Sequence, residues 1–270
     1  MKKLKSKFKK MIKRVKNVGN VLTRIRYTNY YEQLEIKQNI VLAQAYSGMN
    51  FYGNMYYILK EMISRKECEN FEFYVGVRKE DRKEIKKFIN NTFDKKIKIL
   101  NIGSKKYLKI LASAKYLFNN VAFPTYFIKK EGQIYLNTWH GTPLKGLGRS
   151  IMDAPNESGN YQRNFLMTDY LLFPNEYTFN CMREDYMINN FFVGKYVLNG
   201  YPRNSVFYDD NLKKELRKKY QLENKEIIIY MPTWRRKPQK GEEDIQVTKC
   251  IEFVKYLEEN LKENQVLYVK

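Results

Sequence analysis

The side chain most suited to acid–base chemistry occurs once in the chain, as His140. It lies in the segment Leu136-Asn137-Thr138-Trp139-His140-Gly141-Thr142-Pro143-Leu144-Lys145, where an apolar run ends at a polar turn. An imidazole at such a turn can accept a hydroxyl proton near neutral pH. Lys145 could place a fixed positive charge beside a phosphate. The alternative is that His140 is a hydrogen-bonded turn residue without a chemical role.

Three further segments combine a turn-forming glycine or proline with polar residues. They are Asp169-Tyr170-Leu171-Leu172-Phe173-Pro174-Asn175, Asn199-Gly200-Tyr201-Pro202-Arg203-Asn204 and Tyr230-Met231-Pro232-Thr233-Trp234-Arg235. Together with the His140 segment, and in this order, they resemble the CDP-glycerol glycerophosphotransferase family. Members of that family build the poly(glycerol phosphate) or related alditol phosphate chains of teichoic acids and some capsules. The resemblance runs from about residue 40 to the last residue.

This resemblance implies a role for particular residues. His140 would be the general base on the acceptor hydroxyl, and Gly141 and Thr142 would shape the approach to it. Lys145, Arg203 and Arg235 would contact phosphates. The implied substrates are a CDP-alditol donor, CDP-glycerol or CDP-ribitol, and a lipid-linked polyol phosphate acceptor, without a cofactor or metal ion. For each arginine the alternative is an exposed or ion-paired residue at a domain junction.

The family has a two-domain arrangement called GT-B, in which the second domain holds most of the donor nucleotide. That second domain contains a His-Pro turn and a later Asp-Tyr-Ser-Ser segment that holds the donor phosphates, and this sequence contains neither. We therefore expect residues 211–270 to be the beginning of the second domain, and the chain to be a fragment that is inactive without the rest. Ser205 and Arg236 stand where acidic residues are common in the family, which affects only details of the junction.

The elements that must position these residues form an α/β pattern. Apolar strands alternate with helical segments over residues 38–210, which predicts a doubly wound domain. The expected strands are residues 40–45, 71–77, 97–102, 116–118, 134–139, 170–173, 192–198, 227–231 and 265–269. The helices expected among them are residues 52–63, 81–90, 177–189, 211–220 and 247–261.

His140 would follow a strand, where α/β sheets place ligand groups. Neither a Gly-x-Gly-x-x-Gly turn nor a P-loop occurs, which argues against the usual dinucleotide fold and a P-loop NTPase.

Composition adds limits on the partners and the setting. The formal net charge of +21 requires an anionic partner or surface, for which nucleic acid, anionic lipid and a phosphate-rich polymer all qualify. Cys68, Cys181 and Cys250 are widely spaced, which suggests neither a disulfide framework nor a zinc site and fits a reducing, cytosolic setting. No apolar run is long enough to span a membrane, and a signal peptide is not indicated. We expect a peripheral protein on the cytoplasmic face of the cell membrane.

Residues 1–27 predict a basic amphipathic helix. They contain no acidic residue, and their apolar residues recur at spacings of three and four, which gathers them on one face. Such a helix can lie in a membrane interface with its lysines at anionic headgroups. The residues expected to contact lipid are Lys2, Lys3, Phe8, Lys9, Lys10, Ile12, Lys13 and Arg14. The alternatives are that the apolar stripe packs on the rest of the protein, or that the arm binds RNA.

Two other function classes compete with the transferase. A nucleic-acid-binding module would use the charge and the tyrosines, but the sequence has no zinc spacing, RNP-like segment or basic region with heptads. We therefore expect no nucleic-acid partner. A non-catalytic, membrane-associated remnant of a transferase is the stronger rival, because the donor half is missing.

Overall fold

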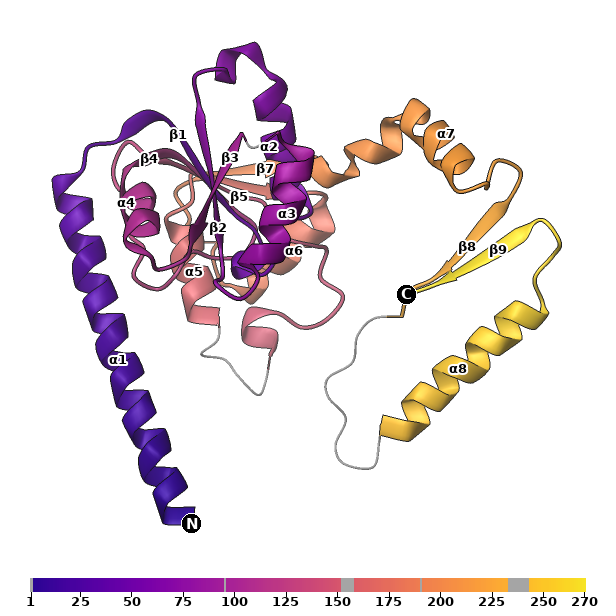
Figure 1. The fold of residues 1–270 in the computed structure, drawn as a ribbon, viewed down its shortest axis with the longest axis horizontal. Helices are drawn as coiled ribbons and strands as arrows, with labels where there is room; N and C mark the ends of the chain where they lie inside the picture. The colour runs from indigo at the N-terminus through magenta and orange to yellow at the C-terminus, as the bar shows by residue number, and fades with distance from the viewer. Residues whose placement is uncertain (1, 95, 152–157, 190, 233–242) are drawn as a thin grey trace. The chain divides into compact units, whose positions relative to one another are not determined.

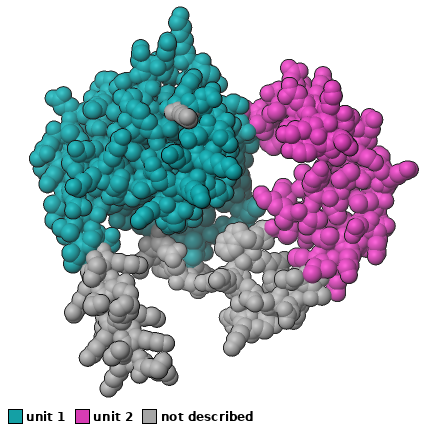
Figure 2. Space-filling view, in the orientation of Figure 1, with its two compact units in different colours: residues 1–204 teal, residues 205–270 magenta. Residues whose placement is uncertain are grey.

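The computed structural model describes residues 2–94, 96–151, 158–189, 191–232 and 243–270, with the side chains of residues 2–17 and 243–248 left out. The chain forms two compact units, Met1–Asn204 and Ser205–Lys270, drawn in teal and magenta in Figure 2. Each unit is described by itself below.

The first unit is built on a seven-stranded sheet in the order β3-β2-β1-β4-β5-β6-β7. All neighbouring strands in it pair in parallel. This confirms the doubly wound α/β prediction, and the strands lie within a few residues of the expected ranges. Their bounds are Lys37–Gln44 for β1, Glu72–Val77 for β2, Ile97–Asn101 for β3, Ala114–Asn119 for β4, Ile134–Asn137 for β5, Tyr170–Phe173 for β6 and Lys195–Leu198 for β7.

Helices cover both faces of this sheet (Figure 1). Successive residues of β1 point to opposite faces, so Ile40 and Leu42 join one buried cluster while Val41 and Ala43 join another. The first cluster includes residues of α1 and α4, and the second includes residues of α2 and α3. The helices are α1 (Lys2–Gln33), α2 (Asn54–Ser64), α3 (Arg82–Thr92), α4 (Lys105–Ser113), α5 (Gly159–Leu166) and α6 (Glu176–Asp185).

Helix α1 extends farther than the sequence predicts. It continues to Gln33, beyond residue 27, where the predicted helix ends. The reason is packing: Tyr27 is 1% exposed within the core, and its hydroxyl donates to the Ile128 oxygen at 2.7 Å. Val18, Leu22 and Ile25, two to nine residues earlier in the helix, are about half exposed. The side chains of Lys2, Lys3, Phe8, Lys9, Lys10, Ile12, Lys13 and Arg14 lie outside the described part.

No helix in the described part of the chain is long and apolar enough to cross a membrane. The three cysteines are free thiols.

The second unit carries a small sheet of its own. Strands β8 (Glu226–Tyr230) and β9 (Gln265–Val269) pair in parallel and are joined through α8 (Glu243–Glu259), and α7 (Asp210–Lys219) precedes them. These elements match the expected strands at residues 227–231 and 265–269. None of the described side chains of this unit is as buried as the core of the first unit.

Candidate active site

The candidate site lies at the carboxyl edge of the seven-stranded sheet. Strand order reverses between β1 and β4, and α/β sheets bind ligands at such switch points. Tyr46 follows β1, Asn120 follows β4 and His140 follows β5. The rings of Tyr46 and His140 are 5.9 Å apart, and the Tyr46 amide donates to Asn120 Oδ1 at 2.8 Å. The ends of three central strands therefore meet around the single histidine.

Strand β5 ends at Asn137, two residues before the expected position, because the chain turns there. The Trp139 amide donates to Asn137 Oδ1 at 2.9 Å, and Trp139 has a φ of +51°. A bulky residue in this left-handed region is strained and persists only where its surroundings hold it. The Trp139 ring packs with Phe165 and Tyr186 in a buried cluster. This anchored turn therefore fixes the position of the following residue, His140.

A backbone carbonyl just after β4 determines which nitrogen of the His140 ring carries the proton. Nδ1 of His140 lies 2.9 Å from the backbone oxygen of Asn120. A carbonyl oxygen only accepts hydrogen bonds, so Nδ1 carries the proton and Nε2 has the free lone pair. Burial lowers the pKa of His140 below its ordinary value; the Asn120 carbonyl opposes this shift and the Arg203 charge adds to it. The ring is therefore neutral and able to accept a proton at neutral pH.

The structure places Arg203 against the same turn. Its Nη1 donates to the His140 backbone oxygen at 2.9 Å, and its guanidinium lies 4.8 Å from the centre of the Tyr201 ring. Tyr201 is buried, and burial raises the pKa of its hydroxyl to about 12, against the lowering effect of Arg203. The Asn199 to Asn204 motif thus contributes one cation to the His140 turn and one neutral phenol beneath that cation.

The loop after His140 is fixed by α6. The Asn175 side chain caps this helix by accepting from the Thr178 amide at 2.9 Å. The Thr178 hydroxyl donates to Thr142 Oγ1 at 3.2 Å, and the Tyr177 hydroxyl donates to the Pro143 oxygen at 3.3 Å. The Asp169 to Asn175 motif therefore supports the loop that carries the predicted substrate-binding residues.

The predicted site residues are distributed as follows. His140, Gly141 and Arg203 lie together, since a Cβ added at Gly141 would come 4.0 Å from Arg203 Nη2. Thr142 is exposed beside them, and Lys145 is exposed farther along the same loop. Arg235 lies outside the described residues. No three His, Cys, Asp or Glu side chains of the described residues are grouped as metal ligands.

Three site residues escaped the sequence analysis: Tyr46, Asn54 and Asn120. Tyr46 and Asn120 follow strands whose carboxyl ends share an edge with that of β5, and this position was the available signal. Asn54 begins α2 after Gly53, whose φ of +65° favours glycine. Its role depends on partners distant in sequence, which no local pattern reveals.

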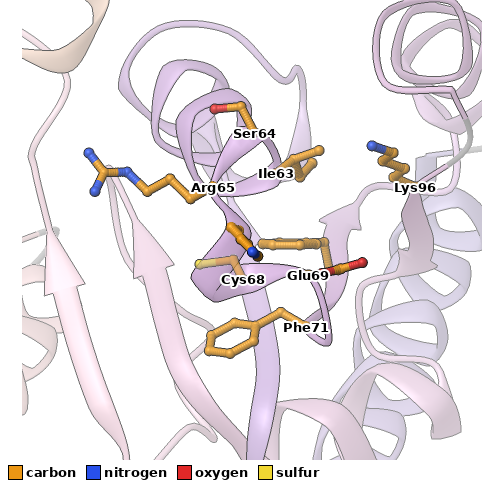
Figure 3. Close-up of a pocket in the computed structure, with 9 residues that line it drawn as sticks. Ile63, Ser64, Arg65, Cys68, Glu69, Phe71 and Lys96 are labelled. Carbon is orange, nitrogen blue, oxygen red and sulfur yellow. The ribbon is translucent and has the colours of Figure 1, made fainter.

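A hollow lies away from this site (Figure 3). Its volume is about 490 Å³, and it is formed by the end of α2, the residues before and within β2, and Lys96 just before β3. Those segments are at the amino edge of the sheet, opposite His140. It contains none of the predicted site residues and combines an apolar floor, including Phe71 and Phe73, with charged side chains such as Arg65.

Comparisons with known proteins agree with this architecture. The chain is 31% identical over 211 residues to a teichoic acid poly(glycerol phosphate) polymerase of Bacillus spizizenii, covering 73% of this chain and 50% of that protein. It is 27% identical over 250 residues to the Bacillus subtilis protein of the same description, covering 86% of this chain and 32% of the relative. The chain thus spans half or less of the length of these curated relatives.

A solved structure of the wall teichoic acid polymerase TagF matches with a TM-score of 0.65 at 23% identity, covering 97% of this chain and 65% of that one. The likeness shows a shared fold and confirms the GT-B-like α/β prediction. The family model described as CDP-Glycerol:Poly(glycerophosphate) glycerophosphotransferase matches residues 25–270. The chain belongs to that family.

Proposed function

We propose that this chain transfers glycerol phosphate from CDP-glycerol to a hydroxyl of a lipid-linked polyol phosphate polymer, as part of teichoic acid or capsule synthesis. Family membership supports the reaction, and the names of the relatives, mostly glycerol phosphate polymerases, favour glycerol over ribitol. Because the chain spans only part of those relatives, the donor nucleotide would depend chiefly on residues beyond the first unit.

The observation that carries the proposal is the Nδ1 contact of His140 with Asn120, which leaves Nε2 as the proton acceptor. In the proposed reaction, the acceptor hydroxyl oxygen attacks the glycerol-bearing phosphorus of the donor. The bond from that phosphorus to the bridging oxygen breaks, and CMP leaves with that oxygen. The hydroxyl proton passes to His140 Nε2. Phosphoryl transfer needs such alignment, and cations at the developing charge, more than covalent catalysis.

The cations proposed for this charge are Arg203 and Lys145. Arg235, which is also predicted to contact a phosphate, lies outside the described residues. Arg203 has the best-supported place, since it already lies at the His140 turn and presents further N–H donors beyond the one bonded to the His140 oxygen. Because Gly141 has no side chain, the space next to this guanidinium is open, which suits the approach of a phosphate. Thr142 offers a hydroxyl at the same edge.

We also propose that the protein acts as a peripheral protein on the cytoplasmic face of the membrane, held by α1 on anionic lipid. The support is the exposed apolar stripe of Val18, Leu22 and Ile25 on a helix whose sequence up to Arg26 is basic and lacks acidic residues. An apolar stripe bordered by charges of one sign suits an anionic interface. Three free thiols suit a reducing compartment.

The test is CMP release from CDP-glycerol in the presence of a membrane-bound acceptor. It should be measured with the 270-residue chain and with the same chain joined to the part of the Bacillus spizizenii relative that it does not cover. Release by either protein supports the transferase. Release by the joined protein alone identifies the chain as the acceptor-side half. No release by either, with retained vesicle binding, favours the non-catalytic remnant, and RNA binding in place of vesicle binding favours a nucleic-acid module.

A further inference from the structure

Asn54, the first residue of α2, is a buried amide with partners on two distant turns. It is 1% exposed. Its Nδ2 donates to Thr138 Oγ1 at 3.1 Å and, more weakly, to the Trp139 backbone oxygen at 3.5 Å. Its Oδ1 accepts from the Arg203 backbone amide at 3.4 Å. One side chain therefore joins the start of α2, the turn before His140 and the turn that carries Arg203.

The orientation of this amide is determined by its partners. The Arg203 amide can only donate, so it must face Oδ1, and the Trp139 oxygen can only accept, so it must face Nδ2. The Thr138 hydroxyl is oriented in turn, because it accepts from Asn54 Nδ2 and donates to the Trp139 oxygen at 2.8 Å. Rotating the amide by 180° would set oxygen against oxygen and N–H against N–H. An aspartate would lose the donor side entirely.

The turn that Asn54 contacts is the strained one. Trp139 has a φ of +51°, and both of its hydrogen-bonded backbone groups are held by side chains: its amide by Asn137 and its oxygen by Thr138 and Asn54. Such a conformation relaxes when the groups that hold it are removed. Relaxation at Trp139 would rotate His140 away from the Asn120 oxygen, which sets its tautomer.

We propose that Asn54 is a positioning residue that holds the Trp139–His140 turn in register with the Arg203 turn, so that His140 Nε2 and the Arg203 guanidinium face the same substrate. Asn54 makes no hydrogen bond to the His140 ring and takes no part in proton transfer. This proposal rests on the proposed role of His140 as the base. The test below does not depend on turnover, so failure of either proposal can be told from failure of the other.

The experiment uses the imidazole ¹⁵N signals of the full chain, which come from His140 alone because the chain has one histidine. In the wild-type protein these signals should show the tautomer with the proton on Nδ1. Asn54→Asp should replace that pattern with a mixture of tautomers. Thr138→Val, which removes the hydroxyl with little change of shape, should move the signals in the same direction. Where turnover is measurable, both variants should lower kcat about 10- to 100-fold with little change in KM, as expected for a misplaced base.

The matched control is Gln133→Glu. Gln133 is also a buried amide, but its Nε2 donates to the Leu111 and Ala114 oxygens and its Oε1 accepts from the Lys130 amide. This variant should lose stability and leave the tautomer of His140 unchanged. If Asn54→Asp unfolds the chain, the His140 signals of Thr138→Val provide the test. A folded Thr138→Val or Asn54→Asp protein whose His140 signals match the wild type would overturn the proposal, as would an equal loss of the tautomer in the Gln133 control.

Discussion

Nδ1 of His140 lies 2.9 Å from the backbone oxygen of Asn120, so the end of β4 sets the protonation of a ring carried by β5. Parallel strands bring their carboxyl ends to one edge, and here that edge joins residues 20 positions apart. The contact needs no carboxylate partner: a main-chain carbonyl orients the ring and leaves its other nitrogen as the acceptor.

The lowered pKa of His140 predicts a pH dependence of stability with a definite sign. In the unfolded chain the imidazole takes up a proton near its ordinary pKa of about 6.5, whereas the folded ring resists protonation. The stability associated with His140 is therefore complete above that value and lost as the pH falls toward the lower folded pKa, by at most about 1.4 kcal/mol per pH unit. Denaturation of wild type and His140→Gln across pH 5 to 8 isolates this change. A pH-independent difference between the two proteins would refute it.

Arg203 should influence His140 by charge and by geometry separately. Arg203→Met removes the nearby cation, so the pKa of His140 should rise. Arg203→Lys keeps the charge but loses the guanidinium that bonds the His140 oxygen and lies over Tyr201, at a cost of about 1 kcal/mol in unfolding free energy. An NMR titration of His140 and denaturant unfolding measure the two effects. An unchanged pKa of His140 in Arg203→Met would show that the charge of Arg203 does not act on the imidazole.

Tyr27 should anchor the end of α1 in the core. Tyr27→Phe removes the bond to the Ile128 oxygen and should cost about 0.5–1.5 kcal/mol. Tyr27→Ala also leaves a cavity and should cost about 3–5 kcal/mol. Val21 is 52% exposed on the same helix, so Val21→Ala should change the free energy of unfolding by less than about 0.5 kcal/mol. Similar losses for Tyr27→Ala and Val21→Ala would show that this end of the helix is not part of the core.

The exposed stripe of α1 should govern membrane binding. Replacing Val18, Leu22 and Ile25 by serine should weaken binding to anionic vesicles about 100-fold, at about 1 kcal/mol per side chain. Binding by the wild type should rise with anionic lipid and fall with salt. Serine at Asn20 and Thr28, which are exposed and polar, is the control. Substitution is preferable to deletion here, because removing the helix would take Tyr27 from the core. If the triple serine variant and the control float equally with vesicles, the proposal that α1 binds membranes through this stripe is contradicted.

The sequence predicted the sheet and the His140 turn because both depend on local signals. Buried runs separated by helical periodicity mark the strands, and the polar turn after Leu136 marks the place where chemistry is expected. The sequence did not predict the end of α1, because Ile25 and Tyr27 are both apolar and only the folded structure shows which of them meets the core. Asn54 and Asn120 were missed for a related reason: their partners lie 84 and 20 residues away in the chain.

The role of His140 as the base is tested most directly by the turnover of wild type and His140→Gln in CMP release from CDP-glycerol, in whichever form of the protein is active. The glutamine keeps a hydrogen-bonding group but cannot accept the proton, so turnover at neutral pH should fall by about two to four orders of magnitude. The dissociation constant of CDP-glycerol should change little, since the donor is proposed to bind chiefly elsewhere. Retention of most of the activity by His140→Gln would contradict the account and would show that the base is another group.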